Sequence, residues 1–145
     1  MRQDRITANA ALKPKKVDFA SILVCVVALV SCARERTALV VGGLYSLSGG
    51  EGSFQIANIL ALDPKCVHIR LYKKKFDTRP SGVDPSALSL GTIHDVDGFS
   101  MGHLPVTRQE FLRWEPLLIA QATVSEDELD GFRIWQEAKG GCFGD

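Results

Sequence analysis

Two alternating apolar segments joined by a short turn constrain the fold of this chain more than any other feature. Residues 54–62 carry apolar side chains on both faces of an extended strand, and residues 66–72 alternate strictly. The turn between them is Asp63-Pro64-Lys65, in which proline sets φ at the first corner. The pattern predicts an antiparallel hairpin. One face of its second strand points inward and carries Val67, Ile69 and Leu71. The other face points outward and carries His68, Arg70 and Tyr72.

Weaker signals extend the β pattern on both sides of this hairpin. Residues 44–47 precede a glycine-rich turn at 48–53, which predicts a strand that leads into the hairpin. Residues 38–41 are compatible with a short first strand, and residues 88–93 predict a later one. Together these segments predict a small, mainly antiparallel sheet.

The C-terminal third predicts two short helices. Thr107 and Glu110 have the spacing of a capping box, in which each side chain bonds the other residue's backbone N–H, and Pro116 ends that helix. A second capping-box match begins at Ser125, and its acidic first turn suits the helix dipole. An apolar stripe follows at helical spacing, and it predicts packing on the sheet. The stripe comprises Leu129, Phe132, Trp135 and Ala138.

Residues 44–93 resemble a small SH3-like barrel of the Tudor type. The match rests on Tyr45 in a first strand, the glycine-bearing loop after it, and the central hairpin. The resemblance implies a small antiparallel barrel, and members of this family bind peptides, methylated side chains or nucleic acid. We expect the shape without that activity, because an aromatic cage needs several convergent rings. The predicted fold is α+β, with an SH3-like barrel or sheet at about 44–93 followed by two helices within about 105–140.

The N-terminal region has the character of an export signal. A basic lead that includes Lys15 and Lys16 precedes an uncharged run of 15 residues at 19–33. That run is shorter than the roughly 20 residues of a membrane-spanning helix. A basic lead, a short apolar stretch and a small residue at the exit are typical of a secretory signal. Leu29-Val30-Ser31-Cys32 resembles the lipobox of bacterial lipoproteins. The resemblance implies cleavage before Cys32 and attachment of lipid to its thiol.

This second resemblance defines the predicted organisation and location. Residues 1–31 are the predicted lipoprotein signal peptide, residues 32–41 a tether, and residues 42–145 a single α+β domain. Lipid on Cys32 implies a membrane partner and a place in the bacterial cell envelope. Ala33 beside the anchor is similar to the pattern that favours the outer membrane in Gram-negative bacteria. The alternative is a cytosolic domain in which the apolar run is a buried strand or helix.

Cysteine usage depends on that interpretation. Cys25 leaves with the signal and Cys32 carries lipid, so Cys66 and Cys142 remain as a pair. In an oxidising compartment such a pair can form a disulfide. The alternative is one strand cysteine and one unpaired thiol near the C-terminus. The sequence leaves both open, because it does not show whether the two β-carbons are close.

One polar segment, residues 94–103, is the candidate for chemistry. Imidazole and carboxylate groups suit several divalent ions, and the candidate ligands are His94, Asp95, Asp97 and His103. The segment also contains a G-x-S-x-G string around Ser100. A serine hydrolase needs a strand before that serine and a helix after it, and a chain of 145 residues is short for such a fold. We favour a structural loop, with no catalytic residue, cofactor or metal.

A basic cluster near the end of the hairpin is the candidate binding surface. Its members are Arg70, Tyr72, Lys73, Lys74, Lys75 and Arg79. In the envelope it would meet a polyanionic polymer or an envelope protein, whereas nucleic acid would require a cytosolic location. Equal numbers of basic and acidic residues, 17 of each, argue against a general nucleic-acid binder.

The sequence therefore predicts a membrane-anchored envelope lipoprotein with a structural or binding role and no enzymatic activity. One alternative is a cytosolic SH3-like binding module that uses the basic cluster. The other is a metal-dependent or serine enzyme centred on residues 94–103.

Overall fold

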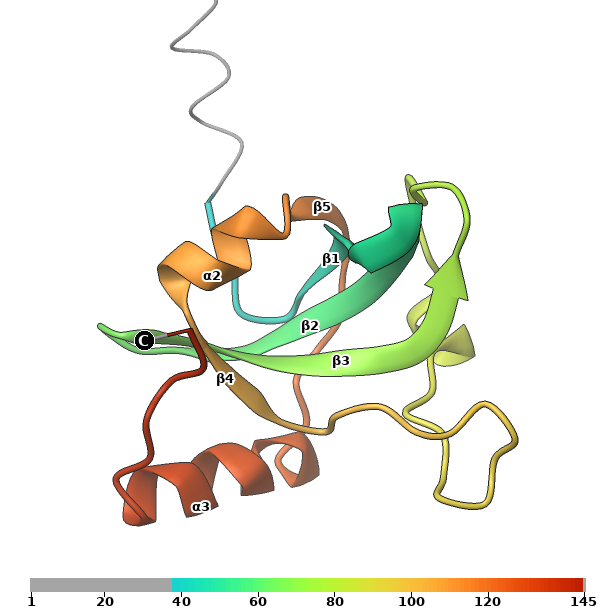
Figure 1. The fold of residues 1–145 in the computed structure, drawn as a ribbon. Coiled ribbons are helices and arrows are strands. Elements are labelled where there is room, and N and C mark those ends of the chain that lie inside the picture. The colour runs from blue at the N-terminus through green and yellow to red at the C-terminus, as the bar shows by residue number, and fades with distance from the viewer. Residues whose placement is uncertain (1–37, 145) are drawn as a thin grey trace, which may run out of the picture. The chain divides into compact units, whose positions relative to one another are not determined.

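The computed structural model in Figure 1 describes residues 38–144, which contain five β-strands, two α-helices and three short 3-10 helices. The predicted signal peptide, the lipobox cysteine Cys32 and most of the predicted tether lie outside the described residues. The described strands and helices belong to one compact unit.

The five strands form a single antiparallel sheet in the order β4-β3-β2-β1-β5. The strands are β1 (Gly43–Ser48), β2 (Phe54–Leu62), β3 (Cys66–Phe76), β4 (Leu104–Thr107) and β5 (Leu117–Gln121). A sheet with two helices confirms the α+β class. Within residues 38–144 the edge strands β4 and β5 do not pair with each other, so the sheet is open. Of the two predicted alternatives, a small barrel or a sheet, the structure has the sheet.

The central hairpin confirms the prediction made from alternation. Strand β2 pairs with β3 from Leu62 opposite Val67 to Phe54 opposite Phe76. The turn is held by the Asp63 carboxylate, whose Oδ1 accepts the backbone N–H groups of Lys65 and Cys66 at 2.7 Å each. Two register shifts interrupt the pairing, and such bulges increase the local twist of a strand.

Each face of the sheet has its own hydrophobic core. Residues that alternate along the strands make up the first core, which is completed by Phe111; its members include Tyr45, Leu47, Ala57, Ile59, Val67, Ile69 and Val106. The second core lies on the other face around Leu44, Ile56 and Tyr72. Both faces are covered along most of the hairpin, so side chains such as His68 that alternation places on the second face are buried, whereas Lys74 and Lys75 near the end of β3 are exposed.

Helix α2 (Arg108–Arg113) covers the first face, and its predicted cap forms only in part. The Thr107 hydroxyl accepts the Glu110 backbone N–H at 3.1 Å. Glu110 pairs with Arg113 instead of returning to Thr107, whose own N–H donates to the Phe143 carbonyl at 2.9 Å. The C-terminal segment therefore replaces one half of the predicted capping box.

Helix α3 (Asp130–Glu137) lies on the opposite side of the sheet from α2 (Figure 1). A 3-10 turn, Asp127–Leu129, precedes it, so the α-helix begins later than the capping match at Ser125 predicts. The Ser125 backbone N–H donates to the Glu128 carboxylate at 2.8 Å. Packing of the apolar stripe on the sheet is confirmed through Phe132 and Trp135, which contact His68 of β3.

Three local predictions are wrong or incomplete. Residues 88–93 form no strand: Leu88 and Leu90 pack on the second core from a loop. Residues 38–41 form no strand either. Strands β4 and β5 were missed, because each is short and pairs along only one edge with a distant strand.

Candidate functional site

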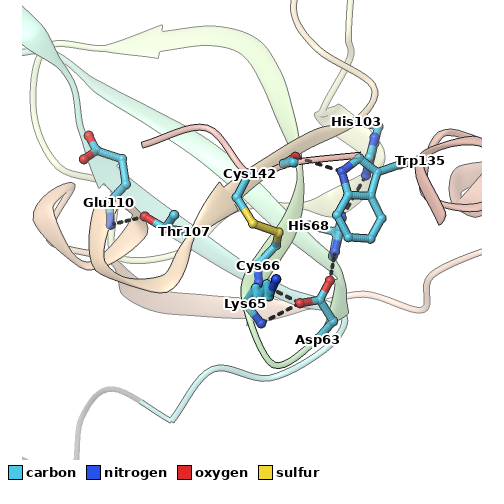
Figure 2. The surroundings of a disulfide bond; sticks show 10 residues. Asp63, Lys65, Cys66, His68, His103, Thr107, Glu110, Trp135 and Cys142 are labelled. Atoms are coloured by element: carbon cyan, nitrogen blue, oxygen red, sulfur yellow. Dashed lines mark hydrogen bonds and ion pairs between the residues drawn. A yellow bond between two sulfur atoms is a disulfide. The ribbon is translucent and has the colours of Figure 1, made fainter. Parts of the chain in front are cut away.

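A disulfide joins the start of β3 to the C-terminal segment (Figure 2). Cys66 and Cys142 are 76 residues apart in sequence, and their Cα atoms are 5.8 Å apart. Phe143 holds the same segment against β4, because its N–H donates to the Pro105 carbonyl at 2.8 Å. Of the two alternatives that the sequence left open for these cysteines, the structure has the bonded pair.

A line of three polar side chains lies beside the disulfide (Figure 2). Nε2 of His68 is 2.8 Å from Oδ2 of Asp63, and Nδ1 of His68 is 3.0 Å from Nε2 of His103. When Asp63 is ionised it accepts the Nε2 proton of His68. Nδ1 of neutral His68 then accepts the proton of His103 Nε2. The chain of hydrogen bonds thus selects the tautomer of both imidazoles.

His68 is the centre of this site and is fully buried, with an exposed fraction of 0%. Its ring is nearly coplanar with that of His103, with 5.3 Å between centroids, and it meets the rings of Phe132 and Trp135 at 4.6 Å and 4.5 Å. The prediction that His68 points to solvent is therefore wrong. Strand alternation placed it correctly on the second face, but helix α3 covers that face.

A glycine lets α3 approach this closely. A β-carbon on Gly131 would lie 2.5 Å from the β-carbon of His103. One turn further along the same face of the helix, Nε1 of Trp135 donates to the Gly141 carbonyl at 2.9 Å, which ties α3 to the segment that carries Cys142.

The environment shifts the pKa values of two members of the line. Burial acts to raise the pKa of the Asp63 carboxyl, but the hydrogen bonds from Cys66, His68 and Lys65 and the nearby His68 charge outweigh it, so the pKa is lowered. Burial, followed by repulsion from His68, lowers the pKa of His103. The two shifts favour an ionised Asp63 and a neutral His103 at neutral pH, one at each end of the line.

The four candidate metal ligands of residues 94–103 do not form a ligand group in the described residues. The Asp95 carboxylate is 2.8 Å from the Lys73 ammonium, and the Asp97 carboxylate is 3.9 Å from it. His94 is exposed, and His103 contacts His68 instead. Within residues 38–144 the group with metal-ligand geometry is Asp63, Cys66 and His68, whose candidate ligand atoms all lie within 4.8 Å of one another. Strand alternation alone does not reveal this group, because Asp63 lies in the hairpin turn and His68 is expected on a solvent face.

The serine-hydrolase arrangement is also absent from the described residues. Ser100 lies in a loop where its N–H donates to the Leu90 carbonyl at 2.8 Å, and the element that follows it is strand β4 rather than a helix. The nucleophile elbow requires the strand-to-helix turn. Ser100 is therefore a loop residue here.

Most residues of the candidate basic surface are paired with carboxylates or buried. Arg70 pairs with Glu128 at 2.6 Å, and Lys73 pairs with Asp95. Tyr72 is buried in the second core, and Arg79 contacts Glu115. Lys74 and Lys75 are exposed, and with Lys73 and Asp97 they line a hollow at the end of β3. Only this part of the predicted surface presents free positive charge.

A second polar group is buried on the same face as His68. The Ser46 hydroxyl and the Asn58 side-chain oxygen are buried with no hydrogen-bond partner within residues 38–144. Tyr72 lies next to them, and burial together with the Glu128 charge raises the pKa of its hydroxyl. The hydroxyl therefore stays protonated as a hydrogen-bond donor.

No protein family, curated protein or solved structure matches this chain. Along residues 38–144, no helix has the length and apolar character needed to cross a membrane.

Proposed function

We propose that this chain is a lipid-anchored protein of the bacterial cell envelope, whose folded domain serves a structural or binding role outside the cytoplasm. The observation that carries the proposal is the disulfide between Cys66 and Cys142. Disulfides persist in oxidising compartments and are rare in the cytosol. This argument is independent of the lipobox at residues 29–32 and points to the same compartment.

A binding role without catalysis fits the arrangement of the candidate residues. The groups that the alternative of a serine or metal-dependent enzyme would use have other partners: Asp95 pairs with Lys73, His103 contacts His68, and His94 is exposed. Lys74 and Lys75 remain exposed near the end of β3. Exposed lysines beside a hollow suit anionic headgroups or the anionic polymers of the envelope.

The alternative of a cytosolic SH3-like module that binds nucleic acid has less support. Nucleic-acid binding depends on several free cations that neutralise phosphates. Arg70 and Lys73 are held by carboxylates, and the sheet is open.

Intact-mass analysis tests the proposal on protein recovered from bacterial membranes, with wild type beside Cys32→Ala. We expect a wild-type chain that begins at Cys32 and carries diacylglyceryl and acyl groups, and a variant that carries neither. Alkylation before reduction should leave Cys66 and Cys142 unlabelled. An unmodified, full-length cytosolic chain with two reactive thiols at these positions would overturn the proposal.

A further inference from the structure

We propose that Asp63, Cys66, His68 and Cys142 form a zinc site when the disulfide is reduced. The proposal concerns a redox state of the folded domain and does not depend on the lipid anchor. Three of the four residues already have candidate ligand atoms within 4.8 Å of one another. The fourth, Cys142, is bonded to one of those three.

The geometry is close to that of a tetrahedral ion. Zinc binds sulfur at about 2.3 Å and imidazole nitrogen or carboxylate oxygen at about 2.0–2.2 Å, so its ligand atoms lie about 3.3–3.8 Å apart. Nε2 of His68 and Oδ2 of Asp63 are 2.8 Å apart. To bind one zinc ion, these two atoms must move about half an ångström further apart. The sulfur of Cys66 lies within 4.8 Å of the candidate ligand atoms of Asp63 and His68, so it must move closer to bind the same ion.

The fourth ligand needs a side-chain adjustment only. The residues on both sides of Cys142 are held in place: the Gly141 carbonyl accepts from Trp135, and the Phe143 N–H donates to Pro105. When the S–S bond opens, the two sulfurs separate. A rotation of the Cys142 side chain then brings its thiolate to the remaining corner of a tetrahedral site. Two thiolates, one imidazole and one carboxylate are a donor set that suits zinc.

The surroundings also match those of bound zinc. The second nitrogen of His68 bonds His103 at 3.0 Å, and a histidine that binds a metal through one nitrogen is generally held by a partner on the other. Phe132 and Trp135 cover the His68 ring. The site is therefore closed to solvent on that side and has the character of a structural centre rather than a catalytic one.

Conversion between the two states balances as a two-electron exchange. A dithiol reductant transfers two electrons and two protons to the Cys66–Cys142 bond, which yields two thiols and the oxidised disulfide of the reductant. Zinc then displaces the two thiol protons as it binds the thiolates. Oxidation of the thiolates by a disulfide reverses the sequence and releases the ion.

Metal titration of the reduced and oxidised proteins tests this inference. The full chain is used with Cys25→Ser and Cys32→Ser, so that Cys66 and Cys142 are its only thiols. Cobalt(II) is the probe, followed by displacement with zinc. We expect the reduced protein to bind one ion with the charge-transfer band of cobalt–thiolate bonds and the visible bands of tetrahedral cobalt. The oxidised protein should show neither.

Variants separate this site from adventitious binding. Asp63→Asn keeps an oxygen for the turn but removes the carboxylate, and Cys142→Ser removes one thiolate. Each should weaken cobalt binding at least tenfold, whereas His94→Asn at an exposed imidazole should leave it unchanged. If the reduced chain unfolds without metal, stoichiometric zinc should restore its circular dichroism. Equal binding by both redox states, wild-type binding by Asp63→Asn and Cys142→Ser, or an unfolded reduced chain that zinc does not refold would each overturn the inference.

Discussion

His68 and His103 are 35 residues apart in sequence, and their nearest ring nitrogens are 3.0 Å apart beneath helix α3. Strand β3 supplies the first and the loop before β4 supplies the second. Asp63 completes the line from the hairpin turn. The His68 ring is buried, so it also packs against its neighbours. Because protein interiors are close-packed, a small change in side-chain volume here should destabilise the surrounding structure.

Gly131 is the first place where that sensitivity can be measured. We expect Gly131→Ala to lower the free energy of unfolding by about 1–3 kcal/mol, because the new methyl group meets the His103 ring and overpacks the site. The gain in helix propensity, about 1 kcal/mol at most, offsets part of this cost. Urea denaturation measures the difference in the free energy of unfolding between Gly131→Ala and wild type. Gly141→Ala is the control, since a β-carbon there meets nothing within 4 Å. Equal stability of the two variants would contradict the close packing of α3.

Loss of the disulfide should destabilise the domain through its unfolded state. Cys142→Ser opens a loop of 76 residues, and we expect a loss of about 2–4 kcal/mol in the free energy of unfolding. Thermal and urea denaturation under non-reducing conditions measure it. The double variant Cys66→Ser, Cys142→Ser serves as the matched control and should lose a similar amount. A single variant as stable as wild type would show that the cross-link contributes nothing.

The Lys73–Asp95 pair should be visible in the titration of the carboxylate. The hydrogen bond from Lys73, with further hydrogen bonds from Thr92, lowers the pKa of Asp95 to about 2. A carboxyl whose folded pKa lies below its unfolded value stabilises the fold above the unfolded pKa. That contribution is lost as the pH falls through the folded pKa. The relevant window therefore runs from about pH 4 down to about pH 2.

NMR titration of side-chain carboxyl carbons checks this pKa directly. In Lys73→Met the pKa of Asp95 should rise toward the ordinary aspartate value. Lys65→Met is the control, because Lys65 is exposed on the hairpin turn, far along β3 from Asp95. An Asp95 pKa that stays near 2 in Lys73→Met would assign the shift to Thr92 instead.

The hollow beside Lys74 and Lys75 should bind polyanions weakly and in a salt-dependent manner. We expect Lys74→Glu with Lys75→Glu to elute from a heparin column at lower salt than wild type, because exposed charges at the hollow change sign. Lys65→Glu with Arg108→Glu changes the net charge equally at other exposed positions and should elute later than the first variant. Coincident elution of the two double variants would show that net charge alone governs retention.

Much of the local structure was predictable because it depends on neighbours in sequence. Alternation identified the β2–β3 hairpin, and Asp63 with Pro64 marked its turn. The capping residue Thr107 marked the start of α2. The predicted strand at 88–93 failed because a run of apolar residues also fits a loop whose side chains fill a core from outside the sheet.

The candidate site was predictable only in its separate parts. Sequence identified Cys66 and Cys142 as a possible pair and named His103 as polar and chemically capable. It grouped His103 with His94, Asp95 and Asp97, because those residues are close along the chain. The true neighbours of His103 are His68 and Gly131, which come from other elements.

By itself the sequence determined the α+β class, the central hairpin, its turn and the helix that follows Thr107, because each depends on periodicity or on contacts within a few residues. Only the tertiary structure decided that β4 and β5 join opposite edges of an open sheet, and that α3 buries His68. Alternation reports which side of a strand a residue occupies. What covers that side depends on contacts between distant segments, so the same pattern is compatible with a solvated face or a buried one.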